Sequence, residues 1–523
     1  MSEAEWIDLA ACGRQYQEVQ ADVCVIGAGA AGIYLTKQMV EQGRSVILLE
    51  AGPSKCTEGG TIGFDVLSEG APYPGAAAGR FFGMGGSTSR WGGALVPHTQ
   101  HDLRTGSASN DVWAHIVNAV SARAPQVLRQ LGYCDAINFD GDADRLLGPT
   151  CRALVTGGLR VQAALYLPFR FRNLVTLLHK TSHPAAAPRV FFNAVAKAWT
   201  LEAGRAGEAR VDKVVAVSRN HNELTVRAGK YVVTAGAIES ARILLEIDES
   251  ASQRVFRPTA AIGCYLADHL SVPIADVTPG TRGRAAALFS PRFSGAWTRS
   301  FRFLDGSPAL DAPRAFAHFI FSGSSRGFDV AREVLGAWQA RRMPSLTAAS
   351  VAAGLGDLVR LGYCRFINSA LYIPAGTPAH LQLDMEQVAV RDNCVSLTSQ
   401  RDAYGRLQAS IRWQVTDIDM AQIETSAHIF LAKWPGASAG LPQLQPRIIG
   451  TDGTKPYSAY HPVGTCRMGD DAEAVVDRHL KVWGMSNLWV SSTGVLPSAG
   501  TANPTFTMLC LTQDLAEHFR AVS

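Results

Sequence analysis

The segment Asp22–Glu50 constrains the fold of this chain most, because it joins two short apolar runs through a glycine-containing turn. Val23–Ile26 and Val46–Leu49 are continuous apolar runs of the kind that form buried parallel strands. The residues between them carry apolar side chains at helical spacing as far as Val40. The segment therefore predicts a complete βαβ unit.

The glycines of this unit lie where the first strand gives way to the helix. Gly27 permits a tight turn, Gly29 lets the backbone approach a pyrophosphate, and Gly32 allows close packing of helix on strand. Glu50 ends the second strand, where a carboxylate can accept from ribose hydroxyls and would repel a 2′-phosphate. The order predicts a bound dinucleotide, NAD or FAD rather than NADP. The alternative is a tight turn without a ligand.

Length and composition limit the remaining possibilities. A chain of 523 residues with 47% hydrophobic and 18% charged residues predicts two closely packed domains. A net charge of +4, without a Lys/Arg-rich run, argues against a nucleic-acid partner. The ten cysteines form no CxxC pair, which favours a reduced, intracellular protein.

The first twenty residues do not resemble a targeting segment. They carry acids at Glu3, Glu5 and Asp8, and no basic region precedes an apolar core, so we expect no secretory signal. The apolar run at 23–33 is too short and too glycine-rich to span a bilayer. We therefore expect a cytoplasmic protein without a transmembrane helix.

A second glycine-rich stretch follows at Gly79–Gly93, with six glycines in fifteen residues. Such a stretch cannot form a stable helix or strand, because each glycine loses much backbone entropy on ordering. A flexible linker is one interpretation, but linkers seldom contain Phe, Met and Trp. We therefore expect a loop whose backbone approaches a ligand.

The first glycine motif, paired with Gly-Arg-x-x-Gly-x-Gly-Gly-Ser-Thr at 79–88, resembles the glucose-methanol-choline (GMC) family of FAD-dependent oxidoreductases. The resemblance implies that residues around Gly85 to Trp91 lie along the flavin ring. Some members attach the flavin covalently through a histidine in this loop. Ser89 and Arg90 stand at the matching positions here, so the resemblance implies non-covalent FAD.

Two residues near the other end of the chain are candidates for the chemistry. His461 lies in a Pro/Gly loop, and Asn503 precedes a proline at a helix start, where its side chain can cap the helix or face a ligand. The patterns His-x-x-Gly-Thr-x-x-Met-Gly from 461, Asn-Leu-x-Val from 487 and Gly-x-x-Asn-Pro-Thr from 500 again resemble the GMC family. The resemblance implies that His461 is the catalytic histidine and Asn503 its partner.

Alcohol oxidation requires negative charge on the oxygen next to the C–H bond. His461 can take the hydroxyl proton near neutral pH, and Asn503 can donate a hydrogen bond to the same oxygen and orient the carbon for hydride transfer to flavin N5. Metal ligation by His461 is disfavoured, because no second His or Cys lies at ligand spacing.

The resemblance also implies the residues that hold the cofactor. They lie in both glycine motifs, near the strands predicted at 190–196 and 224–233, and next to Asn503. The expected cofactor-binding residues are Gly27, Gly29, Ala30, Gly32, Glu50, Ala51, Arg80, Gly85, Gly86, Ser87, Thr88, Trp91, Gly92, Val195, Ala235, Gly236, Pro504 and Thr505.

The expected fold class is α/β plus α+β, with a Rossmann-like FAD domain and a substrate domain built on an antiparallel sheet flanked by helices. We expect the FAD domain at 1–100, 185–270 and 455–523, and the substrate domain at 101–184 and 271–454. Within the latter, 315–321 and 381–387 predict strands, and 395–398 with 407–415 predict a hairpin.

Three features bear on partners and substrate. His269, in a Gly-x-x-Leu-x-Asp-His segment, is interpreted as a hydrogen-bonded structural histidine rather than a catalytic one. Phe169–Arg172 alternates aromatic and basic residues as in a short strand. The insertion 327–362 predicts two helices, whose apolar faces can pack in the core, cap the active site, contact a subunit or touch a membrane.

The predicted function is oxidation of a small-molecule alcohol to a carbonyl. Non-acidic residues at Ser491–Gly494, and a Trp after the second glycine loop, resemble the pyranose-oxidase-like branch and favour a sugar, a polyol or a sugar-containing metabolite. The alternatives are a flavin-dependent lyase, an oxidase of a hydrophobic alcohol such as a sterol or terpenoid, and a non-catalytic flavoprotein subunit. The electron acceptor, oxygen or another compound, and the oligomeric state stay open.

Overall fold

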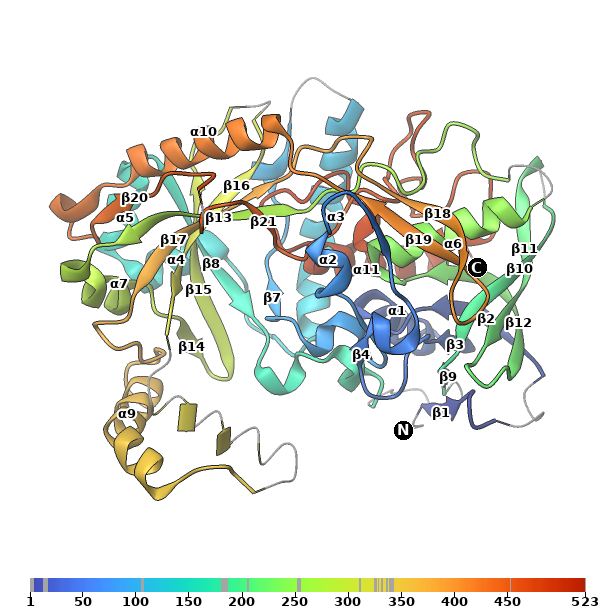
Figure 1. The fold of residues 1–523 in the computed structure, drawn as a ribbon, viewed down its shortest axis with the longest axis horizontal. Coiled ribbons are helices and arrows are strands. Elements are labelled where there is room, and N and C mark those ends of the chain that lie inside the picture. Colours follow the sequence, from blue (N-terminus) through green and yellow to red (C-terminus); the bar gives the residue numbers. More distant parts are fainter. Residues whose placement is uncertain are drawn as a thin grey trace.

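The computed structural model describes residues 4–12, 17–104, 108–179, 187–204, 207–251, 255–309, 312–323, 327, 329–330, 333–334, 337, 343–451 and 453–522. Two large sheets lie toward opposite sides of the view in Figure 1. One apolar core runs without interruption through both sheets.

The first sheet has eight strands in the order β1-β9-β3-β2-β12-β11-β10, with β22 also beside β12. Its central strands β2, β3, β9, β12 and β22 pair in parallel, and β10 and β11 continue it antiparallel. The strands are β1 (Glu5–Asp8), β2 (Glu18–Ile26), β3 (Val46–Leu49), β9 (Arg189–Phe192), β10 (Val195–Ala203), β11 (Ala209–Val217), β12 (Glu223–Val233) and β22 (Leu488–Val490).

The βαβ unit expected from the sequence is present. Helix α1 (Ala30–Glu41) connects β2 to β3, and these strands pair from Val23↔Val46 to Ile26↔Leu49. Helix α11 (Pro504–Ala521) packs against both α1 and α3 (Ala108–Gln130). The ends of β2, β3 and β12 and the starts of α1 and α11 thereby meet around one region.

The second sheet is antiparallel throughout, with the strand order β20-β13-β17-β16-β15-β8-β7; β14 also pairs with β15, and β21 with β13. Two of its strands, β7 and β21, come from segments that the sequence predicts in the FAD domain. The strands are β7 (Ala94–Leu95), β8 (Leu159–Tyr166), β13 (His269–Val277), β14 (Arg292–Ser294), β15 (Trp297–Asp305), β16 (Ala315–Phe321), β17 (Ala379–Glu386), β20 (Leu444–Pro446) and β21 (Tyr457–Ser458).

Two small sheets complete the strands. The hairpin predicted at 395–415 is present as β18 (Cys394–Arg401) and β19 (Leu407–Arg412), with β5 (Leu67–Glu69) beside β19. Strand β4 (Thr57–Glu58) pairs with β6 (Phe81–Phe82), which brings the second glycine loop back toward the first sheet.

The remaining helices surround the sheets. They are α2 (Pro74–Ala77), α4 (Phe139–Leu147), α5 (Pro149–Thr156), α6 (Gly236–Ser250), α7 (Arg282–Phe289), α9 (Ala348–Phe366) and α10 (Asp417–Lys433). Single 3-10 turns lie at Gly59–Ile62, Gly86–Ser89, Gln100–Asp102, Phe169–Phe171, Leu174–Leu177, Pro279–Thr281, Gly436–Ala439 and Thr493–Val495.

Two expectations about local structure need correction. The alternating residues at 169–172 form a 3-10 turn and not a strand, because Pro168 precedes them and Phe171 N–H bonds back to its carbonyl at 2.8 Å. In the insertion, the second predicted helix is present as α9, and its Leu355 and Val359 are exposed, which excludes the alternative that this face packs in the core. The first predicted helix, at 330–338, lies largely outside the described residues.

Candidate active site

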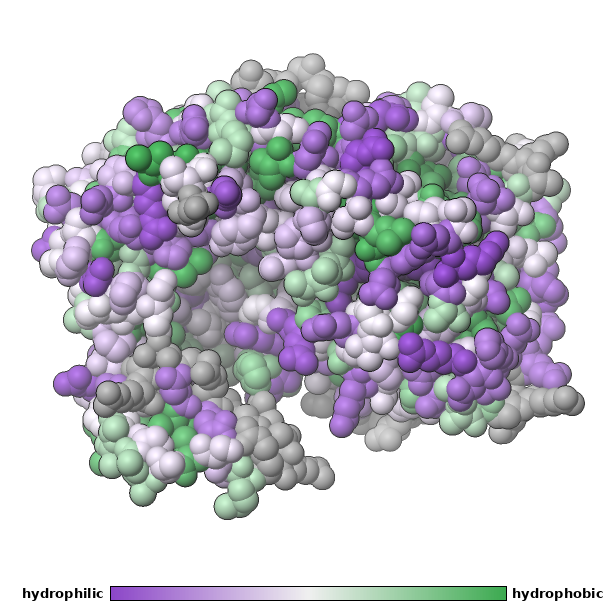
Figure 2. All heavy atoms as spheres, viewed as in Figure 1, coloured by the Kyte–Doolittle hydropathy of each residue, from purple (hydrophilic) through white to green (hydrophobic). Residues whose placement is uncertain are grey.

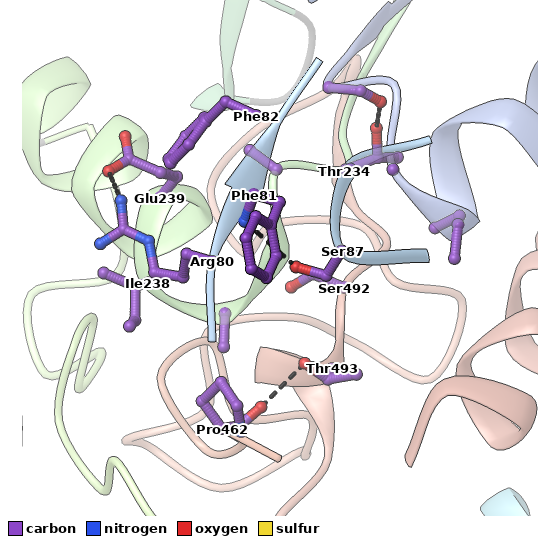
Figure 3. Close-up of a pocket in the computed structure, with 18 of the residues that line it drawn as sticks. Arg80, Phe81, Phe82, Ser87, Thr234, Ile238, Glu239, Pro462, Ser492 and Thr493 are labelled. Atoms are coloured by element: carbon purple, nitrogen blue, oxygen red, sulfur yellow. Dashed lines mark hydrogen bonds and ion pairs between the residues drawn. The ribbon is translucent and has the colours of Figure 1, made fainter. Parts of the chain in front are cut away.

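A cavity of about 600 Å³ lies where the carboxyl ends of β2, β3 and β12 meet the second glycine loop and the segments at 459–462 and 492–505. Figure 3 shows part of its wall, with Arg80, Phe81 and Phe82 from the glycine loop opposite Pro462 and Thr493. The pyrophosphate-binding end of a βαβ unit is this same end of the sheet.

Most residues that the sequence predicts for cofactor binding line this cavity. They are Gly27, Gly29, Ala30, Glu50, Ala51, Arg80, Gly86, Ser87, Thr88, Trp91, Gly92, Val195, Ala235, Gly236, Pro504 and Thr505, and the predicted catalytic His461 joins them. Residues more than 400 positions apart in the sequence therefore share one wall.

Gly32 and Gly85 do not line the cavity, and each packs closely against a neighbouring segment. A Cβ on Gly32 would lie 1.9 Å from the Gly27 carbonyl oxygen, so the glycine lets α1 pass close to the preceding turn. A Cβ on Gly85 would lie 1.9 Å from Oδ1 of Asn173, and the Gly85 backbone has φ 98°. A side chain at either position would clash with these neighbouring atoms.

The start of α1 offers unsatisfied donors to the cavity. Gly29 is its N-cap, so no side chain caps the first turn. A Cβ on Gly86 would lie 3.1 Å from Cα of Gly29, which shows how closely the two glycine loops approach each other. This cradle of backbone N–H groups and helix dipole suits an anionic pyrophosphate.

Glu50 organises this end of the cavity. Its carboxylate accepts hydrogen bonds from Ala28 N–H at 2.7 Å and from Gly52 and Gly83 N–H at 2.8 Å each. Burial raises the pKa of Glu50, and these three donors oppose that rise. Because Oε1 accepts two of the bonds and Oε2 only one, Oε2 keeps a lone pair for a further donor such as a ribose hydroxyl.

Two buried polar atoms on the wall have no partner within the described part of the chain. One is Nη1 of Arg80, whose Nη2 donates to Glu239 at 2.9 Å (Figure 3). The other is Oγ of Ser492. A buried polar group without a hydrogen bond is costly, so these atoms fit a cavity made for a polar ligand.

The sequence did not reveal a charged cluster behind this wall. Glu239 and Arg406 both line the cavity, and Arg406 also bonds Glu246 at 3.0 Å. Arg242, almost completely buried, donates to Asp402 at 2.6 Å. In the sequence, this cluster is visible only as the alternation of Glu239, Arg242 and Glu246 along α6. Such alternating charges are common on exposed helices and do not by themselves indicate a buried cluster.

His461 faces a second histidine. Its Nδ1 lies 3.0 Å from Nδ1 of His269, and Nε2 of His269 lies 2.8 Å from the carbonyl oxygen of Gly500. Burial lowers the pKa of both histidines, and with the added effect of His269 the pKa of His461 falls to about 3. Both rings are therefore neutral at neutral pH, and the interpretation of His269 as a hydrogen-bonded histidine agrees with these contacts.

The hydrogen-bond network assigns the tautomer of each ring. A carbonyl oxygen only accepts, so Nε2 of His269 carries a proton and its Nδ1 is an acceptor. Nδ1 of His461 must then donate to His269. The remaining ring nitrogen, Nε2 of His461, is left unprotonated and able to accept a proton.

Asp268 holds the loop around His461 through hydrogen bonds. One carboxylate oxygen accepts from the backbone N–H groups of His461 and His269, at 2.8 and 2.7 Å, and the other accepts from the Tyr73 hydroxyl. Burial raises the pKa of Asp268 to about 7, against these hydrogen bonds. The orientation of the His461 ring thus depends on residues from three separate segments.

Asn503 is the N-cap residue of α11, but its side chain makes no capping hydrogen bond. It is partly buried and immediately precedes Pro504 and Thr505, which line the cavity. Of the two roles considered from sequence, capping is therefore wrong. The alternative, that the side chain faces a ligand, stays a prediction.

One face of the second sheet adjoins the histidine pair. His269 of β13 contacts His461 and the ring of Phe316, and register places Ser271, Asp384 and Phe316 on the same face. The other members of this face are strongly polar for a sheet interior: Gln382, His318 and Arg302. The opposite face, with Leu270, Val272, Leu383 and Met385, is apolar core.

This polar face carries unsatisfied donors. Nε and Nη1 of the buried Arg302 and Nε2 of Gln382 have no partner among the described residues. Asp384 bonds His318 at 2.9 Å and the Ser271 hydroxyl, which outweigh the effect of burial and lower its pKa to about 2. Asp384 and Arg302 both influence the pKa of His461, so this face lies within electrostatic reach of the ring.

Fold and site together define a class of protein: a parallel sheet and an antiparallel sheet on one core, with a cavity at the carboxyl ends of the parallel strands and a neutral histidine on its wall. A family model described as GMC oxidoreductase matches residues 389–512. This match agrees with the resemblance of the motifs to the GMC oxidoreductase family. The resemblance to this family implies a flavin cofactor.

Two curated relatives and one solved structure illustrate the similarity. The 2-methyl-1,2-propanediol dehydrogenase of Mycolicibacterium austroafricanum is 25% identical over 290 residues, 54% of this chain and 46% of the relative. The C-glycoside 3-oxidase of Arthrobacter globiformis is 29% identical over 131 residues, 25% and 23% of the two chains. The crystal structure of pyridoxine 4-oxidase from Mesorbium loti matches with a TM-score of 0.58 at 16% identity, covering 96% of this chain and 99% of that one.

The sequence matches are partial, whereas the fold matches throughout. The chain spans less than half of the length of these two curated relatives in the alignments. The solved structure is similar over nearly its whole length, and at 16% identity this likeness is one of fold. Within the described residues, no helix is both long and apolar enough to cross a bilayer.

Proposed function

We propose that the protein binds FAD non-covalently and oxidises a CH–OH group to a carbonyl by hydride transfer. The observation that carries the proposal is the His461–His269 pair, which leaves Nε2 of His461 as a proton acceptor beside a cavity of dinucleotide size. The relatives named as a dehydrogenase of a diol and an oxidase of a glycoside support the same reaction class.

In this proposal the chain itself performs the proton chemistry. Nε2 of His461 takes the hydroxyl proton, while His269 holds the ring and fixes the tautomer through Nδ1. The low pKa of His461, about 3, keeps the ring neutral before substrate binds. The negative charge that develops on the substrate oxygen stabilises the imidazolium that forms, so proton transfer and charge build-up support each other.

The side chain of Asn503, which makes no capping hydrogen bond, is proposed to donate a hydrogen bond to the same oxygen and to orient the carbon. The bound flavin supplies one piece of chemistry, which is acceptance of the hydride. Ser89 and Arg90 stand where a covalent attachment would need a histidine, so attachment through this loop is not expected.

The polar sheet face favours a substrate that carries several oxygen atoms, such as a sugar or polyol. Arg302 and Gln382 offer buried N–H donors without partners, and Asp384 offers an ionised carboxylate near the histidine pair. A hydrophobic alcohol would leave these groups unpaired, which disfavours it by a large factor.

The test is anaerobic mixing of the FAD-loaded protein with a panel of sugars, glycosides, polyols and hydrophobic alcohols. We expect loss of the oxidised flavin absorbance with oxygen-rich alcohols. The His461→Ala variant should keep its FAD and reduce it on the order of a hundredfold more slowly. His428→Ala, which removes an exposed histidine of α10, is the control and should react like the native protein.

Equal reduction rates in His461→Ala and the native protein would remove His461 from the mechanism. Product formation without loss of flavin absorbance would instead identify lyase chemistry.

A further inference from the structure

Helix α9 exposes a continuous apolar stripe. Its large apolar residues at Val351, Leu355, Val359 and Tyr363 repeat every four positions and are 36%, 58%, 66% and 58% exposed. Positions four apart lie on one side of a helix, so these residues form a single line along it. Phe366 and Ile367, 80% and 67% exposed, extend the line at its C-terminal end. We call these six residues the α9 stripe.

The stripe projects from the body of the protein. Figure 1 shows α9 at the lower left, beyond β14, and Figure 2 shows apolar surface on this lobe and a hollow between it and the rest of the molecule. The C-terminal end of the helix is held in place: Arg365 donates to the Gly295 carbonyl at 2.6 Å, and its guanidinium lies over the ring of Phe293. The stripe residues are therefore exposed on a helix whose C-terminal end is anchored.

The charges on α9 are placed to suit an anionic surface. Arg360 is exposed, follows the stripe residue Val359 directly and donates to the Tyr372 hydroxyl at 3.2 Å; the partly buried Arg365, which anchors the helix, adds a second positive charge at the same end. The single acidic residue of α9, Asp357, is partly buried and accepts from Gly327 N–H at 3.4 Å. Basic residues beside an exposed apolar line, with aromatic residues at one end, are typical of helices that lie in a membrane interface.

A second copy of the chain is a poorer match for the same surface. Nineteen residues of helix are about 28 Å long, and a line about 10 Å wide gives on the order of 300 Å² per copy. A stable protein interface buries about 800 Å² on each partner and requires a complementary shape. A lipid headgroup layer has no fixed shape and accepts a convex helix.

We propose that the α9 stripe binds the surface of membranes that contain anionic lipids, with the helix lying in the headgroup layer. This inference is independent of the proposed reaction. It requires neither the cavity nor the histidine pair.

The experiment measures co-sedimentation of the full-length, FAD-loaded protein with vesicles of phosphatidylcholine alone and of phosphatidylcholine with phosphatidylglycerol. We expect binding to the anionic vesicles, weaker binding to the neutral ones, and weakening by salt because charges contribute. The double variant Leu355→Glu/Val359→Glu should bind at least about tenfold more weakly.

A matched control is Ile418→Glu/Ile448→Glu, which places two acids at residues 58% and 78% exposed elsewhere on the molecule. The control should bind vesicles like the native protein, and both double variants should keep the native flavin content and circular dichroism. Absence of vesicle binding by the native protein, or an equal loss in both variants, would overturn the inference. The inference would also be overturned if the native protein formed a dimer in solution, did not bind vesicles, and lost the dimer only in the α9 variant.

Discussion

The arrangement of the His461–His269 pair depends on contacts between residues that are 192 positions apart. The sequence predicts His461 and Asn503 because each lies in a short, specific motif, and it predicts the glycines because a turn needs them locally. It does not reveal that Gly500 fixes the tautomer through His269, or that Glu239 and Arg406 line the cavity. Those relations arise only when distant segments pack together.

The buried histidines make stability depend on pH. Burial lowers the pKa values of His98, His269 and His461, so below pH 6.5 the unfolded chain binds protons that the native protein does not. The free energy of unfolding should therefore decrease as pH falls from 6.5 toward 4. Asp268 acts in the opposite direction, because its raised pKa of about 7 lets the native protein bind a proton that the unfolded chain releases.

This balance can be measured by urea unfolding at pH 7.5, 6.5 and 5.5. The native protein should lose stability on acidification, and Asp268→Asn should lose it more steeply because the opposing contribution is gone. A profile that is flat for the native protein, or shallower in Asp268→Asn, would contradict the assignment.

At the scale of elements, the sequence predicts best where a pattern is both local and strong. The β2–α1–β3 unit and the β18–β19 hairpin lie where their patterns place them. The strand predicted at 169–172 is wrong because alternation over four residues does not outweigh a preceding proline. Of the alternatives left open for the apolar face of α9, packing in the core is excluded for Leu355 and Val359, because periodicity indicates an apolar side and not what covers it.

Gly32 tests the packing of α1 on the sheet. In Gly32→Ala, the added Cβ would meet the Gly27 carbonyl oxygen at 1.9 Å and Thr234 Oγ1 at 2.6 Å, so α1 must move away from the strand. We expect lower thermal stability, by roughly 2 kcal/mol or more, and weaker retention of FAD. Differential scanning calorimetry and flavin absorbance measure both.

The control is Gly356→Ala in the exposed part of α9, where no atom lies within 4 Å of the new Cβ. It should be neutral or stabilise by about 0.5 to 1 kcal/mol, because alanine favours a helix over glycine. If both substitutions have the same effect, close packing at Gly32 is not the reason for that glycine.

At the scale of the whole molecule, the cavity is lined by segments that range from residue 26 to residue 508. The two-sheet arrangement follows from the predicted strands, but the division into domains remains a prediction. The relative placement of the sheets could not be predicted, because it depends on side-chain packing in a core that both share.

A ligand that contacts so many segments should stabilise the whole chain. We expect FAD to raise the melting temperature in a concentration-dependent manner, and the free energy of unfolding to increase by about 2.7 kcal/mol at a free FAD concentration a hundredfold above its Kd. Acid precipitation of the protein should release all flavin into the supernatant. Flavin that stays with the precipitate would indicate a covalent bond.

The position of β12 has a consequence for the order of folding. The C-terminal residues of β12, Tyr231–Val233, pair on one side with β2, near the N-terminus of the chain. On the other side they pair with β22 at Leu488–Val490. During synthesis, β12 is complete long before β22 leaves the ribosome, so its exposed edge must wait for a partner about 250 residues later. Such long-range closure is slow, and a nascent chain therefore needs protection of that edge until its cofactor cavity can form.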